Sequence, residues 1–240
     1  MKALRSMVFN IAFYCNIIFW LILAIPLLFF PRKYLFRLIG WWVSVNFWLL
    51  EHIAGIKCVF RHTERIPEGG ILVASKHQSF WETFALFSLF KDPLFVLKRE
   101  LMWIPFFGWY LKKLGCIAVE REAGEKSVRI MLNKARDAIA QQRQVIIFPE
   151  GTRTSPGDPP SYKRGVELLY RMLKVSCVPI ALNSGLFWPR RRFIRHPGTI
   201  IVEICPLIDA GLKGKEFSDI LQARIESEMP QLLNEDTQKS

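Results

Sequence analysis

A histidine and a carboxylate stand five positions apart in the segment His77-Gln-Ser-Phe-Trp-Glu82. A histidine with an unperturbed pKa of about 6.5 can take a proton from an alcohol near neutral pH. A neighbouring carboxylate can hold one ring nitrogen, which sets the tautomer and leaves the other nitrogen as a base. The pair therefore predicts activation of a hydroxyl group, with His77 as base and Glu82 as its orienting partner.

A second segment, Phe148-Pro-Glu-Gly-Thr-Arg153, offers ligands for phosphate and hydroxyl groups. Arg153 can bind a phosphate in a bidentate manner, and Thr152 and the Gly151 backbone can add donors. Glu150 can accept a hydrogen bond from a hydroxyl. A solvated charged turn has a similar composition, so this segment alone leaves both interpretations open.

Both segments follow short apolar runs rich in β-branched residues, which predict strands. Seven such runs occur after residue 51, at residues 58–60, 71–75, 94–97, 116–119, 145–148, 178–182 and 199–205. Apolar residues at helical spacing predict a helix over residues 124–142 and another over 216–233. The alternation predicts an α/β fold with a mixed sheet covered by helices, and strand ends in such folds bind ligands.

Ser79 and Glu82 also fit a capping box, in which a serine begins a helix and a glutamate three residues later bonds back to it. This structural role is compatible with the catalytic one, because the carboxylate folds back toward His77. A serine esterase or thioesterase using Ser79 is the alternative. The sequence lacks the G-x-S-x-G elbow of such enzymes, which favours Ser79 as a cap.

The N-terminal region is typical of membrane association. Residues 7–30 contain no charge and are long enough to cross a bilayer, whereas the apolar, Trp-rich residues 38–50 are too short and predict an interfacial helix. Basic residues flank both ends of residues 7–30, so a full crossing and a helix pair in one leaflet both stay open. We expect a membrane-associated helix pair in residues 1–52 and an α/β domain in residues 53–240.

The net charge of +12 indicates anionic partners. Zinc-finger spacing, an RNP-like motif and a long basic arm are all missing from the sequence, so lipid and phosphate are favoured over nucleic acid. The five cysteines are scattered, which predicts neither a metal site nor a disulfide framework and favours a reducing compartment. We expect a bacterial inner membrane location with the α/β domain on the cytoplasmic side.

Residues 186–195 interleave aromatic residues with arginines, including Arg190, Arg191 and Arg192. Such a segment is either a solvated charged loop or a contact with anionic lipid headgroups, because aromatics insert while arginines attract phosphate.

Four blocks in order make the chain resemble the glycerophospholipid acyltransferase family, specifically the lysophosphatidic acid acyltransferases. This sequence matches the family block N-H-x-S-x-x-D at residues 76–82 and the block G-x-x-F/A-x-x-R at residues 115–121. It matches F-P-E-G-T-R at residues 148–153 and V-P-I/V at residues 178–180. The resemblance covers roughly residues 55–210. The first block departs from the pattern, because Glu82 replaces the usual aspartate and Lys76 replaces asparagine.

The resemblance implies a reaction without a covalent enzyme intermediate. His77 deprotonates the acceptor hydroxyl, which attacks the thioester of acyl-CoA or acyl-carrier protein, and backbone donors near the helix after Ser79 stabilise the oxyanion. The expected binding residues are Lys98, Arg121 and Arg153 for phosphate, Glu150 and Gly151 for the glycerol site, and Thr152 as a further substrate-binding donor. No cofactor or metal is expected beyond the acyl donor, and the partners are membrane lipids and the lysolipid. Acylation of another lysolipid, or lipid binding without turnover, are the alternatives.

Overall fold

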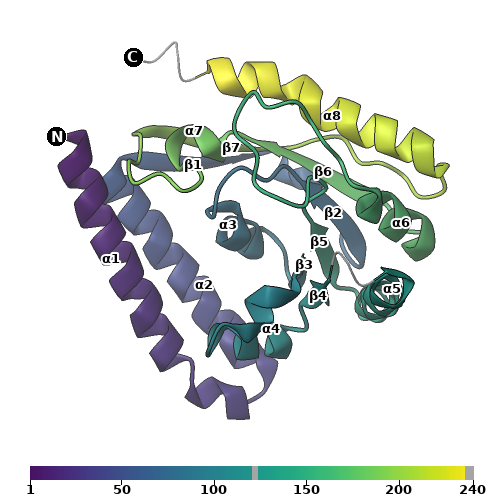
Figure 1. Ribbon diagram of the computed structural model, residues 1–240, viewed down its shortest axis with the longest axis horizontal. Helices are drawn as coiled ribbons and strands as arrows, with labels where there is room; N and C mark the ends of the chain where they lie inside the picture. The colour runs from purple at the N-terminus through teal and green to yellow at the C-terminus, as the bar shows by residue number, and fades with distance from the viewer. Residues whose placement is uncertain (121–123, 236–240) are drawn as a thin grey trace.

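A mixed β-sheet forms the centre of the molecule in a computed structural model that describes residues 1–120 and 124–235 (Figure 1). Within these residues the sheet has seven strands. They are β1 (Ile56–Arg61), β2 (Ile71–Ser75), β3 (Pro93–Lys98), β4 (Ile117–Val119), β5 (Gln144–Ile147), β6 (Cys177–Leu182) and β7 (Gly198–Ile204). All seven predicted strands are present, with ends within two residues of the predicted ones.

The strand order is β1-β7-β6-β2-β5-β3-β4. The five strands from β6 to β4 are parallel to one another, and β7 pairs with β6 in the antiparallel direction. The carboxyl ends of β6, β2, β5, β3 and β4 therefore lie at one edge of the sheet. The segments that follow these strands meet there, as in other α/β folds.

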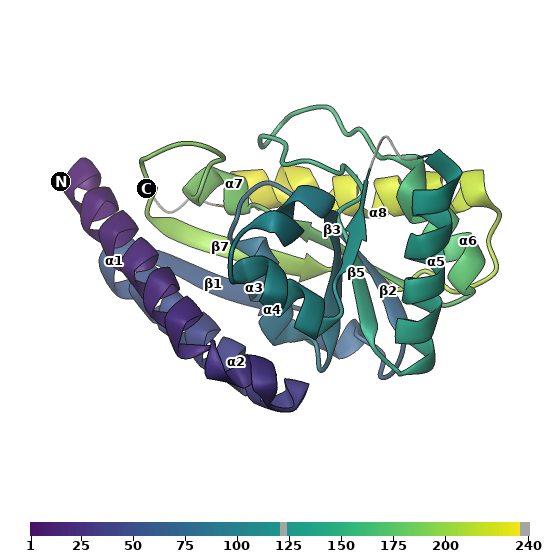
Figure 2. The same ribbon diagram turned by 60° about the horizontal axis from the view of Figure 1, so that its bottom comes forward.

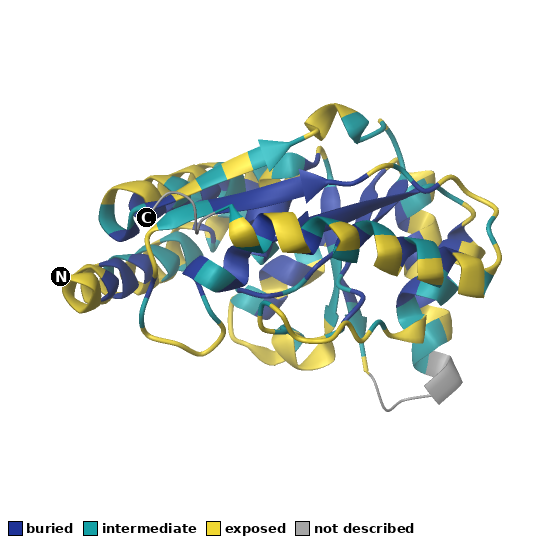
Figure 3. Cartoon of the chain, turned by 90° about the horizontal axis from the view of Figure 1, so that it is seen from above, coloured by how far each residue is buried: buried dark blue, intermediate teal, exposed yellow. Residues whose placement is uncertain are grey.

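Alternate residues of the central strands point to opposite faces of the sheet, and each face has its own hydrophobic core. The central strands are accordingly buried (Figure 3). On β2, Leu72 and Ala74 face one core, whereas Val73 faces the other. The first core is covered by α5 (Gly124–Ala140), α6 (Arg164–Leu173) and α8 (Gly214–Asn234). The second is covered by α3 (Glu82–Leu89) and by the two N-terminal helices. The predicted helices over residues 124–142 and 216–233 correspond to α5 and α8.

The N-terminal helices α1 (Lys2–Leu23) and α2 (Arg32–Leu49) run antiparallel side by side, joined by a 3₁₀ turn, η1 (Pro26–Phe29) (Figure 2). The segment Lys2–Phe29 is long and apolar enough to cross a membrane, and 11% of its most apolar window is buried. Helix α2 begins earlier than the apolar stretch 38–50, because Pro31 starts it and basic residues form its first turn. A π-helical turn, η2 (Leu50–Ala54), connects α2 to β1.

The N-terminal helices share a hydrophobic core with the sheet. Phe9 and Phe13 of α1 are almost fully buried and pack edge-on against Trp188, with ring centroids 5.3 and 4.9 Å away. Val43 of α2 lies in the same cluster as Val73 of β2. The division of the chain at residue 52 stays a prediction, since this shared core joins the two parts.

The segment between β3 and β4 supports the turn of the N-terminal helix pair. It forms a 3₁₀ turn, η4 (Arg99–Trp103), and helix α4 (Phe107–Leu114). The Tyr110 hydroxyl donates to the carbonyl of Leu21 (2.6 Å), and Lys113 Nζ donates to that of Leu28 (2.9 Å). These bonds connect the end of α1 and the turn that follows it to the sheet domain.

The remaining short elements are a 3₁₀ turn, η3 (Thr63–Arg65), and helix α7 (Ser184–Phe187), which directly follows β6. Three of the five cysteines, Cys116, Cys177 and Cys205, are buried. Burial raises the pKa of Cys116 to about 11 and that of Cys205 to about 12.

Candidate active site

Three parallel strands deliver polar segments to the same edge of the sheet. His77 follows β2, the segment Phe148-Pro-Glu-Gly-Thr-Arg153 follows β5, and Ser184 follows β6. The first two segments are hydrogen-bonded to each other, since the Thr154 backbone N–H donates to the His77 carbonyl (2.8 Å). The fold therefore brings both predicted motifs together.

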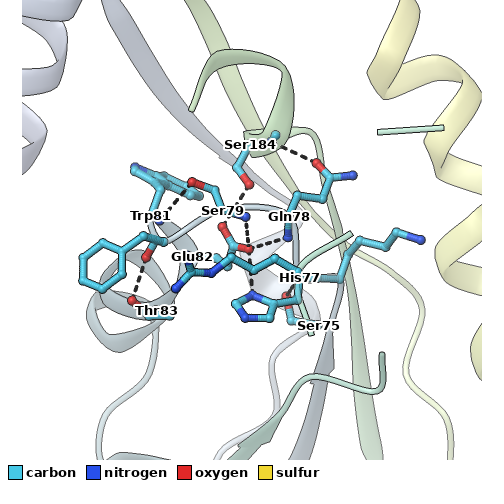
Figure 4. Close-up of polar contacts among 12 residues, drawn as sticks. Ser75, His77, Gln78, Ser79, Trp81, Glu82, Thr83 and Ser184 are labelled. Carbon is cyan, nitrogen blue, oxygen red and sulfur yellow. Dashed lines mark hydrogen bonds and ion pairs between the residues drawn. The ribbon is translucent and has the colours of Figure 1, made fainter. Parts of the chain in front are cut away.

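His77 and Glu82 form the predicted pair (Figure 4). The Nδ1 atom of His77 lies 2.9 Å from Oε1 of Glu82, which is fully buried. The imidazole is 13% exposed, and its Nε2 has no hydrogen-bond partner within residues 1–120 and 124–235. With a proton held on Nδ1 by the carboxylate, a neutral imidazole presents Nε2 as the base.

Glu82 accepts three further hydrogen bonds. Its Oε1 accepts from the backbone N–H groups of Gln78 (2.6 Å) and Ser79 (2.7 Å), and its Oε2 accepts from the Ser184 hydroxyl (2.9 Å) (Figure 4). All four partners are donors, as a carboxylate requires. The side chain is therefore held at both oxygens by segments from two different strands.

The capping prediction is right in its contacts and differs in the position of the helix. Ser79 Oγ accepts from the Trp81 N–H (3.2 Å) while Glu82 bonds back to Ser79, but regular helix α3 begins only at Glu82. Because the N–H groups of Gln78 and Ser79 are occupied by Glu82, neither is available to stabilise an oxyanion. Ser79 is fully buried, which supports its role as a cap over that of a nucleophile.

Glu150 positions the main chain of His77. It is 2% exposed, and its Oε2 accepts from the His77 backbone N–H (3.0 Å). Its Oε1 accepts from the Thr154 hydroxyl (3.0 Å) and pairs with Nζ of the buried Lys76 (3.0 Å). The His77 ring also stacks on Phe148, with centroids 3.9 Å apart. Glu150 thus holds the backbone of His77, while Glu82 and Phe148 hold its ring.

Arg153 lies half-buried next to this pair, with its guanidinium 5.8 Å from the centre of the Phe80 ring. Burial lowers the pKa of Arg153, an effect that Glu82 opposes and that Arg190 and Arg191 reinforce. A cation in this setting is suited to bind an anionic group close to His77. Thr152 is exposed, and its hydroxyl accepts a long hydrogen bond of 3.5 Å from Arg190.

Known proteins are similar to this chain in sequence and in fold. A protein-family model described as acyltransferase matches residues 57–183, more than half of the chain. A 1-acyl-sn-glycerol-3-phosphate acyltransferase of Pseudomonas aeruginosa is 34% identical over 94% of this chain and 89% of its own length. This chain belongs to the acyltransferase family.

Two further comparisons agree with this assignment. A 1-acyl-sn-glycerol-3-phosphate acyltransferase of Borreliella burgdorferi is 28% identical over 73% of this acyltransferase and 69% of its own length. The crystal structure of the 1-acyl-sn-glycerophosphate (LPA) acyltransferase PlsC from Thermotoga maritima superposes with a TM-score of 0.82 at 20% identity. It covers 97% of this chain and 98% of its own, so the predicted mixed α/β fold is confirmed over nearly the full length.

The other predicted binding residues differ in what the structure places around them. Gly151 has a φ of +66°, which favours glycine, and its N–H bonds to the Phe148 carbonyl (2.9 Å) within the turn. Lys98 ends β3 at the site edge but is exposed and paired with Glu100 (2.7 Å). Arg121 lies outside the described residues. Binding roles for these residues stay predictions.

Sequence reasoning missed two residues that the acyltransferase uses to hold its site together. Ser184 binds Glu82 from 102 positions away, and Glu226 of α8 pairs with Lys76 (2.7 Å) from 150 positions away. Neither separation gives a local pattern. The replacement of the family asparagine by Lys76 was the one available signal, because a buried lysine requires carboxylate partners.

Proposed function

We propose that this acyltransferase moves a fatty acyl group from a thioester donor to the free hydroxyl of lysophosphatidic acid, giving phosphatidic acid. The observation that carries the proposal is the His77–Glu82 pair, with Nε2 unpartnered in the described structure, beside the unchanged Phe-Pro-Glu-Gly-Thr-Arg segment. The names of the relatives support the acceptor. The donor is acyl-CoA or acyl-carrier protein.

The residues suggest how the proton moves. Nε2 of His77 takes the proton of the acceptor hydroxyl, whose oxygen attacks the thioester carbonyl. When the tetrahedral intermediate collapses, the C–S bond breaks and the thiolate leaves with the proton that His77 returns. Glu82 stabilises the imidazolium between these two steps. The acid and base roles thus fall on one residue, and no covalent enzyme intermediate is needed.

Arg153 is the best placed described cation for the acceptor phosphate, because it is half-buried and lies at the ring of Phe80, three residues from His77. Arg121 and Lys98 are proposed as further phosphate ligands. Glu150 acts through the backbone of His77, and Gly151 and Thr152 shape the adjacent turn. We assign no step to a metal or cofactor.

A membrane location fits this chemistry. Both acceptor and product are amphiphiles, and α1 presents exposed apolar residues such as Ile11, Tyr14 and Ile18 at 58–60% exposure. We propose that the α1–α2 pair attaches the enzyme to a bacterial inner membrane, with the sheet domain on the cytoplasmic side. The free cysteines are consistent with a reducing compartment.

The test is an acceptor panel with the purified full chain in mixed micelles. Labelled acyl-CoA and acyl-carrier protein are supplied with lysophosphatidic acid, glycerol 3-phosphate or lysophosphatidylcholine. We expect transfer to lysophosphatidic acid that falls by about 10²–10⁴-fold in H77A. S79A is the matched control, because it removes only a cap, and it should keep most activity.

Other outcomes identify the alternatives. Preference for a different lysolipid would change the assigned acceptor but would not contradict the proposed mechanism. Undiminished transfer by H77A would remove the base assignment, loss of activity in S79A would favour the esterase mechanism, and no transfer by the unmodified chain would favour lipid binding without turnover.

A further inference from the structure

A loop that contacts the candidate active site contains four arginines without an acidic partner in the described part of the chain. Residues 189–195, which follow α7 and are called here the arginine loop, contain Arg190, Arg191, Arg192 and Arg195. None of the four is paired with a carboxylate within residues 1–120 and 124–235. Their like charges act on the site itself, since Arg190 and Arg191 help lower the pKa of Arg153. An external anion would relieve this excess of positive charge.

Arg195 gives the loop a defined shape. Its guanidinium lies 4.8 Å from the centre of the Trp188 ring, and Nη1 donates to the carbonyls of Arg192 (2.5 Å) and Phe193 (3.2 Å). Arg195 is 7% exposed, and its Nε is buried without a partner in the described structure. The loop is therefore closed around a buried cation, while Arg191, Arg192 and Phe193 are exposed.

The loop is also bound to α1. The Asn10 side chain donates to the Phe193 carbonyl (3.0 Å), and the Arg195 backbone N–H donates to the Ser6 hydroxyl (2.9 Å). In Figures 1 and 2 the segment after α7 accordingly lies beside the N-terminal half of α1. A groove between the two is lined by Met7, Ile11, Tyr14, Arg192, Phe193 and Arg195.

This surface combines cations with exposed apolar side chains. Phe193 is 54% exposed, and Ile11 and Tyr14 on the neighbouring helix are 58% and 60% exposed. A nucleic acid backbone would match the arginines but would leave these apolar groups in water. A bilayer of anionic phospholipid matches both, since its phosphates meet arginines and its acyl region meets aromatic and aliphatic side chains.

We propose that the arginine loop and the adjoining face of α1 form a docking surface for anionic phospholipid headgroups, which holds the active-site edge against the membrane. The loop is connected to the predicted phosphate segment, because Arg190 Nη1 donates to the Arg153 carbonyl (2.9 Å). Docking therefore brings headgroups next to Arg153. The inference rests on the proposed function only in taking the acceptor to be a membrane lipid.

The experiment places a fluorescent label on the loop of the full chain in lipid nanodiscs. A nitrobenzoxadiazole group is attached to F193C after Cys15 and Cys58, the two cysteines that are not buried, are changed to serine. Discs contain phosphatidylcholine alone or mixed with phosphatidylglycerol, and the neutral quencher acrylamide reports exposure. Labelled I130C on α5 is the control, because Ile130 is similarly exposed (44%) on a distant helix.

Acrylamide should quench the label at position 193 at least about fivefold less in anionic discs than in neutral discs. One arginine near an anionic surface favours binding to that surface by about this factor. The label at position 130 should not distinguish the discs. R191Q/R192Q should remove the difference at position 193, whereas K134Q/R136Q, which loses the same charge on α5, should keep it.

Equal quenching at position 193 in both discs would overturn the proposal, as would persistence of the difference in R191Q/R192Q. Shielding of the label in detergent without lipid would indicate contact with protein instead. Added salt tests the electrostatic attraction with all four arginines in place and should weaken the shielding. None of these signals requires turnover, so an enzyme that fails to acylate lysophosphatidic acid but shows lipid-dependent shielding would refute the proposed function alone.

Discussion

Restoring the family aspartate at position 82 should impair this enzyme. The Glu82 carboxylate is held at 2.6–2.9 Å by His77, Gln78, Ser79 and Ser184. E82D withdraws the carboxylate by about one C–C bond, or ~1.5 Å, which takes the His77 contact beyond hydrogen-bond range unless α3 shifts. A lost charge-assisted hydrogen bond is worth about 1.5–3 kcal/mol, so we expect kcat to fall by roughly 10- to 150-fold.

The assay compares E82D with E82Q and S184A in mixed micelles. The acceptor KM of E82D should stay within about twofold, because Glu82 is fully buried and this substitution keeps the negative charge that acts on Arg153. S184A keeps the His77 contact and should lose about 3- to 10-fold, from a hydrogen bond worth ~1 kcal/mol. E82Q keeps the length but removes the charge that stabilises the imidazolium, a change that costs about 10⁴-fold in a serine-protease triad.

From highest to lowest kcat, the expected order is therefore S184A, E82D and E82Q. Thermal unfolding is measured for each variant to separate effects on catalysis from effects on stability. An E82D enzyme as fast as the native one would refute the reasoning, because the length of Glu82 would then not matter. E82Q exceeding E82D would show that geometry outweighs charge at this position.

Three further predictions concern stability. K76M should destabilise the fold by about 3–5 kcal/mol, because it leaves the buried Glu150 and the partly buried Glu226 without their cation, and adding E226Q should recover part of the unfolding temperature. G108A should lower the unfolding temperature by several degrees, since the new Cβ would lie 2.0 Å from the Met102 carbonyl oxygen and overpacking costs about 1–3 kcal/mol. Burial raises the pKa of Cys116 from 9.0 to about 11, so its contribution to stability is complete below pH 9.0 and is lost as the pH rises toward 11. Unfolding midpoints of the native chain should thus fall more steeply across this interval than those of C116A.

The sequence was most informative where one physical effect dominates. Runs of valine and isoleucine predicted all seven strands, because buried parallel strands are apolar on both faces. Helix starts were harder to predict. Helix α3 begins at Glu82 instead of following Ser79 directly, because Glu82 binds the preceding backbone N–H groups itself. Helix α2 begins at Arg32, since a helix is not limited to its apolar positions.

The sequence predicted those contacts of the site that lie within a single local motif. His77 and Glu82 are five positions apart, and the strand-to-helix turn makes their contact almost inevitable once both elements form. The contacts of Ser184 and Glu226 depend on which strands are neighbours and on where α8 crosses the sheet. Those are properties of the whole fold, and a pattern in one segment contains no information about them.

The pairing of Lys76 with Glu226 has a consequence for the order of events during synthesis. Lys76 immediately precedes the proposed base, but one of its two carboxylate partners lies on α8, the last helix of the described chain. During translation α1 emerges before α8, and it can meet a membrane long before α8 exists. If α1 attaches to a membrane as proposed, the nascent enzyme reaches its lipid surface while the proposed catalytic centre is still incomplete, and the site is assembled only when α8 leaves the ribosome.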